Sequence, residues 1–271
     1  MTPPADGKRV VVAVMLAREH LPFIRGWCEH HVAQGWSICL YDNSGSTGSS
    51  RESSIFSKGH LQRSGYDKRG RNYAAYTADL SDADVRQALL HELRGLPVEL
   101  CDWHPRNAEG DVIHGQVAAY VDFIRRYRAR VDWAAFIDCD EYLQTGAGLT
   151  WTQLLHELSG SSIHRALLRG ITYGARWSVN GRPLPLESLP CGGEQERTGE
   201  PYNGCKNIVR LAQVERADIH WYWQMTGGNR MAVLDAAQFH FKHYKLAEQP
   251  LRYENLPGFQ PTGVLDESEP V

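Results

Sequence analysis

Apolar and polar positions follow two distinct periods along the N-terminal half of the chain. A continuous apolar run rich in β-branched residues, from Val10 to Leu16, is typical of a strand that is buried on both faces. The following segment carries apolar residues at i, i+3 and i+4 spacing, which predicts an amphipathic helix that ends at Gly35. The same two patterns predict strands at 36–41, 98–101 and 133–137, and helices at 81–93 and 114–130.

The helix expected at 114–130 has a clear apolar face, which is formed by Val117, Tyr120, Val121, Ile124 and Tyr127. The second half of the chain is less regular. It suggests a helix near 150–158, strands near 166–173, 208–211, 219–223 and 238–244, and a long Pro/Gly-rich stretch at 174–204. A Ser/Gly-rich loop is expected at 44–73. Strands that alternate with helices predict an α/β fold with a mostly parallel central sheet flanked by helices.

The composition narrows the class of protein. The 271 residues are 42% hydrophobic and 23% charged, which is ordinary for a globular chain that forms one large domain. We expect this domain to cover residues 1–255 and a peripheral tail to cover 256–271. A net charge of −3 argues against a nucleic-acid partner. The longest apolar run is too short to cross a bilayer, and the six cysteines form no C-x-x-C pair, so a cytoplasmic location is expected.

Three acidic residues, Asp138, Asp140 and Glu141, directly follow the apolar strand at 133–137. In open α/β sheets, ligands bind at the carboxyl ends of strands, and Asp42 follows another such strand. If the chain stays extended, Asp138 and Asp140 point to the same side and repel each other unless a cation lies beside them. Oxygen ligands of this kind suit Mg²⁺ or Mn²⁺. The alternative is a strand cap followed by solvated turn residues.

Seven segments resemble, in the same order, motifs of the nucleotide-sugar glycosyltransferases of the GT-A fold, most closely the DUF23-like, family 92 group. The segments are Val14–Glu19, Trp27–Gly35, Tyr41–Thr47, Gly115–Tyr120, Phe136–Leu143, Lys206–Arg210 and Phe241–Tyr244. Phe136–Leu143, FIDCDEYL, is similar to the family's F-x-D-x-D-E-F motif. The resemblance implies a Rossmann-like GT-A domain, with a nucleotide-sugar half at about 8–145 and an irregular acceptor half at about 146–255.

The resemblance also implies an activity and a metal. A family member moves a sugar from a nucleoside-diphosphate-sugar donor to a hydroxyl of a saccharide or glycoconjugate, and inversion at the sugar is expected. Asp138 and Asp140 then correspond to the residues that hold Mn²⁺ or Mg²⁺ against the donor diphosphate, which gives Asp140 a catalytic role as well. His243 corresponds to a third metal ligand, whereas His240 and His220 are weaker candidates. His240 and His243 would point oppositely on a strand.

Other positions match the family's donor and acceptor sites. Glu19 and Asp42 correspond to turns at the nucleotide end of the donor site. Lys206 and Arg210 are expected to contact phosphate or the acceptor. Direct transfer requires a general base near the acceptor hydroxyl, and the resemblance favours Glu196. Glu194 and Asp218 are the alternatives for that role.

The chain departs from the family pattern at three places. Ala17 and Arg18 replace the first two residues of K-N-E, Thr47-Gly48 stands where an aspartate is expected, and Lys242 replaces an asparagine. The identity of the donor is therefore not carried over from the family. Two other functions remain open on the sequence: a phosphatase with Asp138 as its nucleophile, and a carbohydrate-binding protein without turnover.

Overall fold

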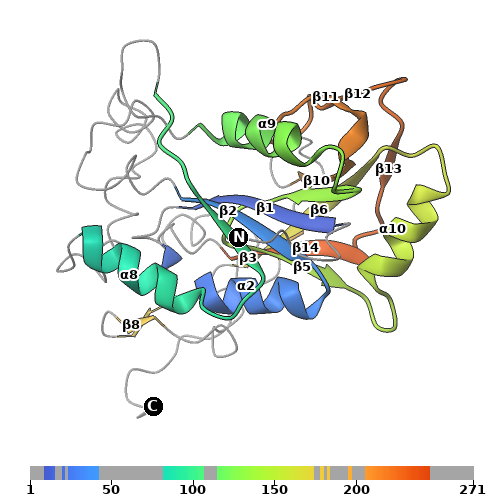
Figure 1. Cartoon of the computed structure of the whole chain (residues 1–271). Helices are drawn as coiled ribbons and strands as arrows, with labels where there is room; N and C mark the ends of the chain where they lie inside the picture. The colour runs from blue at the N-terminus through green and yellow to red at the C-terminus, as the bar shows by residue number, and fades with distance from the viewer. Residues whose placement is uncertain are drawn as a thin grey trace, which may run out of the picture.

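The computed structural model describes residues 9–15, 20–21, 24–42, 82–106, 115–173, 178–179, 182–183, 195–196 and 205–244. Their largest element is a mixed sheet with the strand order β3-β2-β1-β4-β10-β6-β14-β5 (Figure 1). In that order the strands are β3 (Val98–Asp102), β2 (Ser37–Asp42), β1 (Arg9–Met15), β4 (Trp133–Phe136), β10 (Cys205–Arg210), β6 (Arg165–Tyr173), β14 (Phe239–Tyr244) and β5 (Glu141–Thr145). The expected α/β class with a mostly parallel sheet is confirmed.

The half of the sheet built from the N-terminal part of the chain is parallel. β1 lies between β2 and β4 and pairs parallel with both, and β2 pairs parallel with β3. The carboxyl ends of these strands therefore meet along one edge of the sheet. Asp42 ends β2 at this edge, and Asp138 follows β4 there. This common edge is the place where α/β folds bind ligands.

The other half brings strands from late in the chain next to β4. β10 runs antiparallel between β4 and β6, and β14 runs antiparallel to β5 and parallel to β6. Two further strands, β13 (Met231–Val233) and β9 (Gln195–Glu196), also pair with β6. Two small ribbons complete the strands: β7 (Ser178–Val179) with β8 (Arg182–Pro183), and β11 (Val214–Arg216) with β12 (Gln224–Met225).

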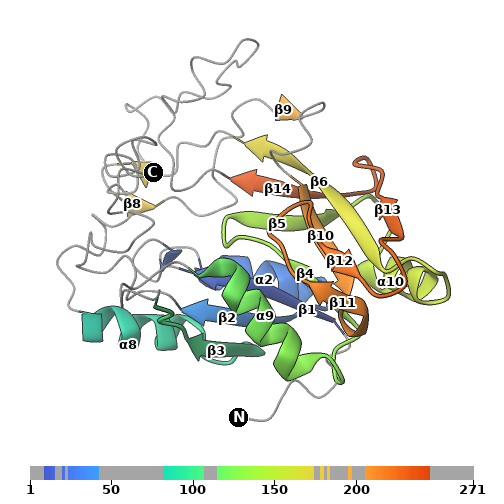
Figure 2. The same cartoon turned by 90° about the horizontal axis from the view of Figure 1, so that it is seen from above.

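Helices cover both faces of the sheet (Figures 1 and 2). On one face lies α9 (Gln116–Tyr127), and on the other lie α2 (Ile24–Ala33), α8 (Asp82–Glu92) and α10 (Trp151–Ser159). The continuous apolar run of β1 follows from this, because alternate residues enter the two cores: Val11, Ala13 and Met15 on one side, Val10, Val12 and Val14 on the other. Within the described residues, no helix is long and apolar enough to cross a membrane.

Most expected elements are confirmed with small shifts at their ends, but two expectations are wrong. Residues 219–223 form a loop between β11 and β12 and not a strand. The apolar face of α9 is also rotated: Val117 is exposed, whereas Ala119 and Phe123 are buried. The loop expected at 44–73 and the tail at 256–271 lie outside the described residues, and so does most of 174–204.

Candidate active site at the carboxyl edge

The three acidic residues lie in a tight turn that connects β4 to β5. The backbone N–H of Glu141 donates to the carbonyl of Asp138 at 3.1 Å, which reverses the chain. The extended chain assumed for Asp138 and Asp140 is therefore wrong. The Glu141 carboxylate bends back in the same turn, where Oε2 accepts the backbone N–H of Asp138 at 2.9 Å. Since Glu141 is 1% exposed, it supports the turn from inside.

Lys206 supplies the positive charge that this turn requires. Its Nζ lies 2.7 Å from Asp138 Oδ2 and 3.3 Å from Glu141 Oε2. The Lys206 side chain is only 2% exposed, whereas Asp138 keeps 39% of its side chain exposed. Lys206 was expected to contact phosphate or the acceptor, but its ammonium is bound between two carboxylates beneath the surface. Asp138 is the member of this group that faces outward.

His243 reaches the turn from the neighbouring strand. It lies opposite Glu141 in the register between β14 and β5. Its Nε2 is 3.3 Å from Asp140 Oδ2, and its Nδ1 is 3.7 Å from Glu141 Oε1. Phe241, which packs in the core, and His243 lie on the same face of β14, because side chains alternate along a strand. His240 lies on the opposite face, as expected. The structure thus brings Asp140 and His243 together.

The start of α9 fixes the second oxygen of Asp138. Gln116, the first residue of the helix, donates from Nε2 to Asp138 Oδ1 at 2.6 Å. Gly115 precedes it with φ 57°, and a Cβ atom there would lie 2.4 Å from Cγ of Pro105. A glycine is therefore required for α9 to begin at this place and in this direction. The family-like motif from Gly115 to Tyr120 thus has a structural reason in this chain.

The helix α2 holds the outer edge of β5. Trp27 Nε1 donates to the carbonyl of Glu141 at 2.8 Å, and the N–H of Leu143 donates to His31 Nε2 at 3.3 Å. Since His31 Nε2 accepts, Nδ1 carries the proton and donates to the carbonyl of Trp27 at 2.8 Å. His30 Nε2 contacts the Leu143 carbonyl at 2.7 Å. Side chains of α2 thus supply hydrogen-bond partners for outward-facing backbone groups of the edge strand β5, and they hold the acidic turn in place.

The charged groups in the turn shift one another's pKa values. Desolvation alone would raise the pKa of Asp138, but the Lys206 ammonium outweighs it and holds the carboxyl pKa well below its usual value. Burial would lower the pKa of Lys206, and the Asp138 and Glu141 carboxylates instead raise it. Burial raises the pKa of Glu141 to about 8, against the opposing effect of Lys206. Asp138 and Lys206 therefore form the ionised pair, while Glu141 holds a proton more tightly than an exposed glutamate does.

The other predicted site residues are distributed differently. Asp42 lies at the same edge of the sheet but is buried, and its Oδ2 is 2.9 Å from Arg86 Nη1 of α8. Arg210 pairs with Trp133 at the opposite end of β4 and donates to the carbonyl of Ser159 at 2.5 Å, so it is separate from the acidic turn. Glu19 lies outside the described residues.

The candidate bases lie on the acceptor side. The backbone of Glu196 is placed in β9 opposite Ile171 of β6, whereas Glu194 lies outside the described residues. Asp218 Oδ2 accepts the backbone N–H groups of His220 and Tyr222, at 3.0 and 2.9 Å, so this carboxylate shapes a loop. That use of Asp218 makes it a poor candidate for the base.

Two of the predicted metal ligands have a separation that suits a shared ion. Neighbouring ligands of an octahedral ion with bonds of about 2.1 Å lie about 3 Å apart, and Asp140 Oδ2 and His243 Nε2 are 3.3 Å apart. Asp138 keeps acceptor capacity, because each carboxylate oxygen can accept more than one partner. The described structure does not bring ligand atoms of Asp138, Asp140 and His243 within 4.8 Å of one another. The donor types fit a hard divalent cation.

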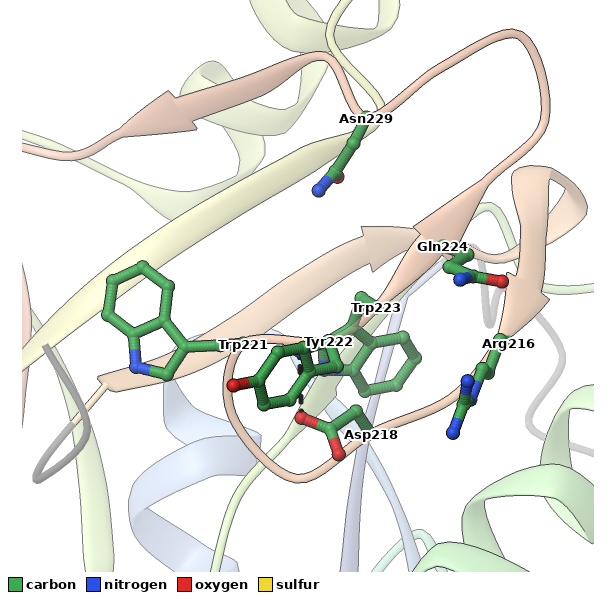
Figure 3. A pocket seen from close by; sticks show the side chains of 7 residues that line it. All are labelled: Arg216, Asp218, Trp221, Tyr222, Trp223, Gln224 and Asn229. Carbon is green, nitrogen blue, oxygen red and sulfur yellow. Dashed lines mark hydrogen bonds between the residues drawn. The ribbon is translucent and has the colours of Figure 1, made fainter.

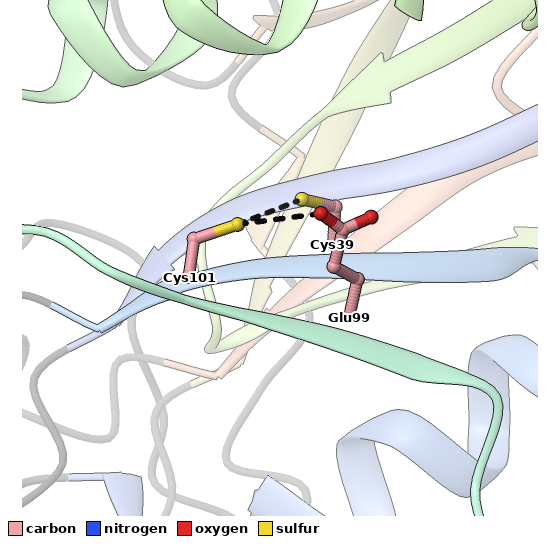
Figure 4. Close-up of side chains that lie close together, drawn as sticks. All are labelled: Cys39, Glu99 and Cys101. Carbon is pink, nitrogen blue, oxygen red and sulfur yellow. Dashed lines mark hydrogen bonds between the residues drawn. The ribbon is translucent and has the colours of Figure 1, made fainter. Parts of the chain in front are cut away.

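A different group of potential ligands is closer together. Cys39, Glu99 and Cys101 lie side by side on β2 and β3 (Figure 4), with the two sulfur atoms 3.9 Å apart and Cys101 Sγ 3.7 Å from Glu99 Oε1. Arg126 of α9 donates to Cys101 Sγ at 3.1 Å and also pairs with Glu99. The guanidinium already supplies the positive charge, so we interpret this group as a polar network that fixes α9 to the edge strand β3.

Sequence reasoning missed the supporting residues of the acidic turn. Trp27, His31 and Gln116 all stand in motifs that were identified by resemblance, but no role was predicted for any of them. A signal existed for α2, because Trp27, His31 and the neighbouring Gln34 share one helix face by their spacing. Lys206 offered no such local signal, since its partners lie more than sixty positions away in the chain.

Comparisons with known proteins identify a family for the chain. The sequence model of glycosyltransferase family 92 matches residues 82–266, which include Asp138, Asp140, Lys206 and His243. No protein with a curated description matches the chain.

Two of the solved structures that resemble the chain have low sequence identity to it. One is described as the UTP-bound UGPase from Acinetobacter baumannii, at 10% identity and a TM-score of 0.34, with 93% of this chain and 95% of that chain covered. Another is UDP-glucose pyrophosphorylase complexed with UDP-glucose, at 12% identity and a TM-score of 0.30, with 88% and 90% covered. Both TM-scores are below 0.5, so neither structure bears on the ligand or the activity of this chain.

Proposed function

The chain belongs to glycosyltransferase family 92, and we propose that it is a divalent-metal-dependent enzyme. It transfers a sugar from a nucleoside-diphosphate-sugar donor to a hydroxyl of a saccharide or glycoconjugate, with inversion. The observation that carries this proposal is the acidic turn itself. Asp138 and Asp140 lie at the carboxyl edge of the sheet, and His243 of β14 faces Asp140 at 3.3 Å.

In this proposal, Asp140 and His243 hold Mn²⁺ or Mg²⁺ together with Asp138. When bound, the ion supplies Lewis-acid stabilisation of the diphosphate that leaves the sugar. Lys206 keeps Asp138 ionised and oriented, since its ammonium lies 2.7 Å from Oδ2. Gln116 holds the other oxygen of the same carboxylate. Asp138 is thereby presented at the surface in one orientation, and its exposed part is available to the metal-bound donor.

Glu196 is proposed as the general base that takes the proton of the acceptor hydroxyl. Its support is the register of the sheet: Ile171 of β6 pairs with Glu196 on one side and with Lys242, the neighbour of His243, on the other. The backbone of Glu196 is thus placed across one strand from the metal-binding edge. Asp42 is proposed at the nucleotide end of the donor site, where Arg86 holds its carboxylate.

The proposal is tested by donor turnover. Purified protein is incubated with a panel of nucleotide sugars and, in separate samples, with simple phosphate esters, each with and without Mn²⁺. The release of nucleoside diphosphate and of inorganic phosphate is measured separately. We expect nucleoside diphosphate release from one class of donor, dependent on the metal and lost in Asp140→Asn. Release of inorganic phosphate from simple phosphate esters, without use of any nucleotide sugar, would support a phosphatase and overturn the proposal.

A further inference from the structure

A cavity lies between the loop that connects β11 to β12 and the turn that follows β12. It has a volume of about 390 Å³, which falls within the range of small-ligand sites, about 300–1,000 Å³. Figure 3 shows the residues that line it. They include Arg216, Asp218, Trp221, Tyr222, Gln224 and Asn229. This cavity is built by the loop between β11 and β12 and by the turn that follows β12.

The loop between β11 and β12 has a fixed shape. Asp218 Oδ2 accepts the N–H group of Tyr222 (Figure 3) and also that of His220, so one carboxylate closes the loop from inside. Arg165 Nη1 donates to the carbonyl of Trp221 at 3.0 Å and holds the same loop from β6. Arg165 is 2% exposed. The aromatic residues at 221 and 222 are therefore presented by a well-supported backbone.

His220 connects this loop to the acidic turn. Its ring Nδ1 is 3.0 Å from the carbonyl of Cys205, and its own carbonyl accepts from Asn207 Nδ2 at 2.6 Å. Cys205 and Asn207 are the two neighbours of Lys206, whose ammonium binds Asp138. The loop is thus attached on both sides of the residue that holds the acidic turn. The loop that lines the cavity is therefore connected to the strand segment that carries Lys206.

Side-chain packing gives a second connection between the cavity and the end of β4 that leads into the acidic turn. Trp223 follows the aromatic pair and is 1% exposed. Its ring lies 4.9 Å from the ring of Phe136, two residues before Asp138, and 6.5 Å from the ring of Tyr120, in the first turns of α9. Trp223 therefore forms a rigid floor under the cavity. A substitution of Trp223 would therefore alter the packing of Phe136 at the end of β4.

The surface of the cavity suits a sugar ring. Tyr222 is 65% exposed, a high value for a large aromatic side chain, and the half-buried Trp221 precedes it. The face of an aromatic ring binds the C–H groups on one face of a pyranose, while the ring edges and nearby side chains reach its hydroxyls. Arg216, Gln224 and Asn229 provide several donors and two amide acceptors for those hydroxyls. Arg216 and Asp218 carry opposite charges, which favours a neutral sugar.

We propose that this cavity is the acceptor subsite and that it binds a neutral hexopyranoside by stacking on Tyr222. This inference rests on the proposed function and adds the chemical class of the acceptor and the residues that select it. The loop that presents Tyr222 is joined through His220 to Cys205 and Asn207, the two neighbours of Lys206. Tyr222 is a specificity-determining residue in this account, while Asp218 shapes the loop.

The test uses methyl hexopyranosides and their β-linked disaccharides as probes, with saturation-transfer NMR on the full chain. Wild-type protein is expected to bind at least one neutral probe. Tyr222→Ala should weaken that binding about tenfold, as expected for a lost aromatic contact. Tyr222→Phe is the matched variant, because it keeps the ring face and should retain binding. A sugar-acid probe, methyl glucuronide, should bind more weakly than methyl glucoside.

The outcomes separate this inference from the proposed function, because the same samples are also heated with nucleoside diphosphate and Mn²⁺. Tyr222→Ala should keep the metal-dependent stabilisation of the wild type. If no probe binds, or if Tyr222→Ala binds as well as the wild type while that stabilisation is intact, the acceptor subsite is wrong and the proposed function stands. If sugars bind through Tyr222 but no nucleotide stabilises the chain, the proposed function fails and the cavity is a sugar-binding site of another kind.

Discussion

Lys206 Nζ lies 2.7 Å from Asp138 Oδ2, and this pair connects two strands that are far apart in the chain. The lysine comes from β10, which the fold inserts antiparallel next to β4. A carboxylate at the end of a buried strand is unfavourable without a partner. Lys206 is that partner, and it leaves the outer part of Asp138 exposed.

Replacement of Lys206 by methionine should destabilise the fold strongly. The substitution keeps most of the side-chain volume but leaves Asp138 and Glu141 without the ammonium that binds both. Breaking a fully buried ion pair typically costs about 3–5 kcal/mol. Because Asp138 keeps 39% of its side chain exposed, we expect a loss of about 2–3 kcal/mol, which urea unfolding measures. The exposed i,i+4 pair of Arg25 and Glu29 provides a control: Glu29→Gln, which removes the charge of this pair, should cost about 0.5 kcal/mol or less. Equal losses in the two variants would refute the structural role of Lys206.

Two buried tryptophans allow the hydrogen bond to β5 to be measured. Trp27 Nε1 donates to the carbonyl of Glu141, whereas Trp36 Nε1 has no hydrogen-bond partner among the described residues. Both rings are at most 2% exposed, so Trp→Phe removes a similar volume at each. Trp27→Phe should cost about 1–3 kcal/mol more than Trp36→Phe, because it leaves a buried carbonyl unpaired. Chemical denaturation of both variants decides this, and a smaller loss for Trp27→Phe would contradict it.

Gly115 should not tolerate a side chain. Its φ of 57° disfavours other residues, and an added Cβ would meet Pro105 at 2.4 Å. We expect Gly115→Ala to cost about 2 kcal/mol or more, and to reduce donor turnover because Gln116 is displaced from Asp138. Gly26 of α2 is exposed and has no atom within 4 Å of an added Cβ. Gly26→Ala should therefore stabilise the protein by about 0.5–1 kcal/mol. Thermal unfolding with parallel turnover assays checks both variants.

The buried His31 should make stability fall in mild acid. Burial lowers the pKa of this imidazole from 6.5 to about 3. The unfolded chain therefore binds a proton below pH 6.5 that the folded chain refuses, and stability is lost as the pH falls from 6.5 towards 3. At pH 5 this contribution is about 2 kcal/mol. His31→Gln should lose this part of the pH dependence in urea titrations at pH 7.5 and 5.

The exposed His91 of α8 is the control for that experiment, because its substitution leaves the buried imidazole in place. His91→Gln should show the same change in stability between the two pH values as the wild type. If His31→Gln also keeps the full wild-type change, the acid sensitivity comes from other groups and the role given to His31 is wrong.

Local patterns predicted much of the fold because most of its elements are local. The apolar run of β1 and the helical spacing around Trp27 are consequences of burial that any single segment displays. β5 was not predicted. Only a short turn, closed by the hydrogen bond between Asp138 and Glu141, separates it from β4, so the two strands look like one continuous segment in the sequence. The loop at 219–223 was predicted as a strand for a related reason. Its backbone is held by hydrogen bonds to the Asp218 carboxylate and not by a strand ladder, and only Trp223 of its aromatic residues is fully buried.

The site was predicted only in part, because some of its contacts depend on strand pairing between distant segments of the chain. Asp138, Asp140 and His243 could be identified by resemblance, and the structure brings Asp140 next to His243. The position of Lys206 depends on the pairing of β10 with β4, and Arg210 is carried to the other end of the same pair. One antiparallel register therefore decides which of two basic residues approaches the acidic turn. No local pattern contains that information.

The central claim is that the turn from Asp138 to Glu141 binds a metal together with a diphosphate. Thermal unfolding with nucleoside diphosphates, each with and without Mn²⁺, tests it most directly, because a ligand that binds only the folded state raises the melting temperature. We predict a rise that requires both components in the wild type, is lost in Asp140→Ala, and persists in Asp132→Asn, at the exposed opposite end of β4. A full metal-dependent rise in Asp140→Ala, or none with any diphosphate in the wild type, would contradict the account.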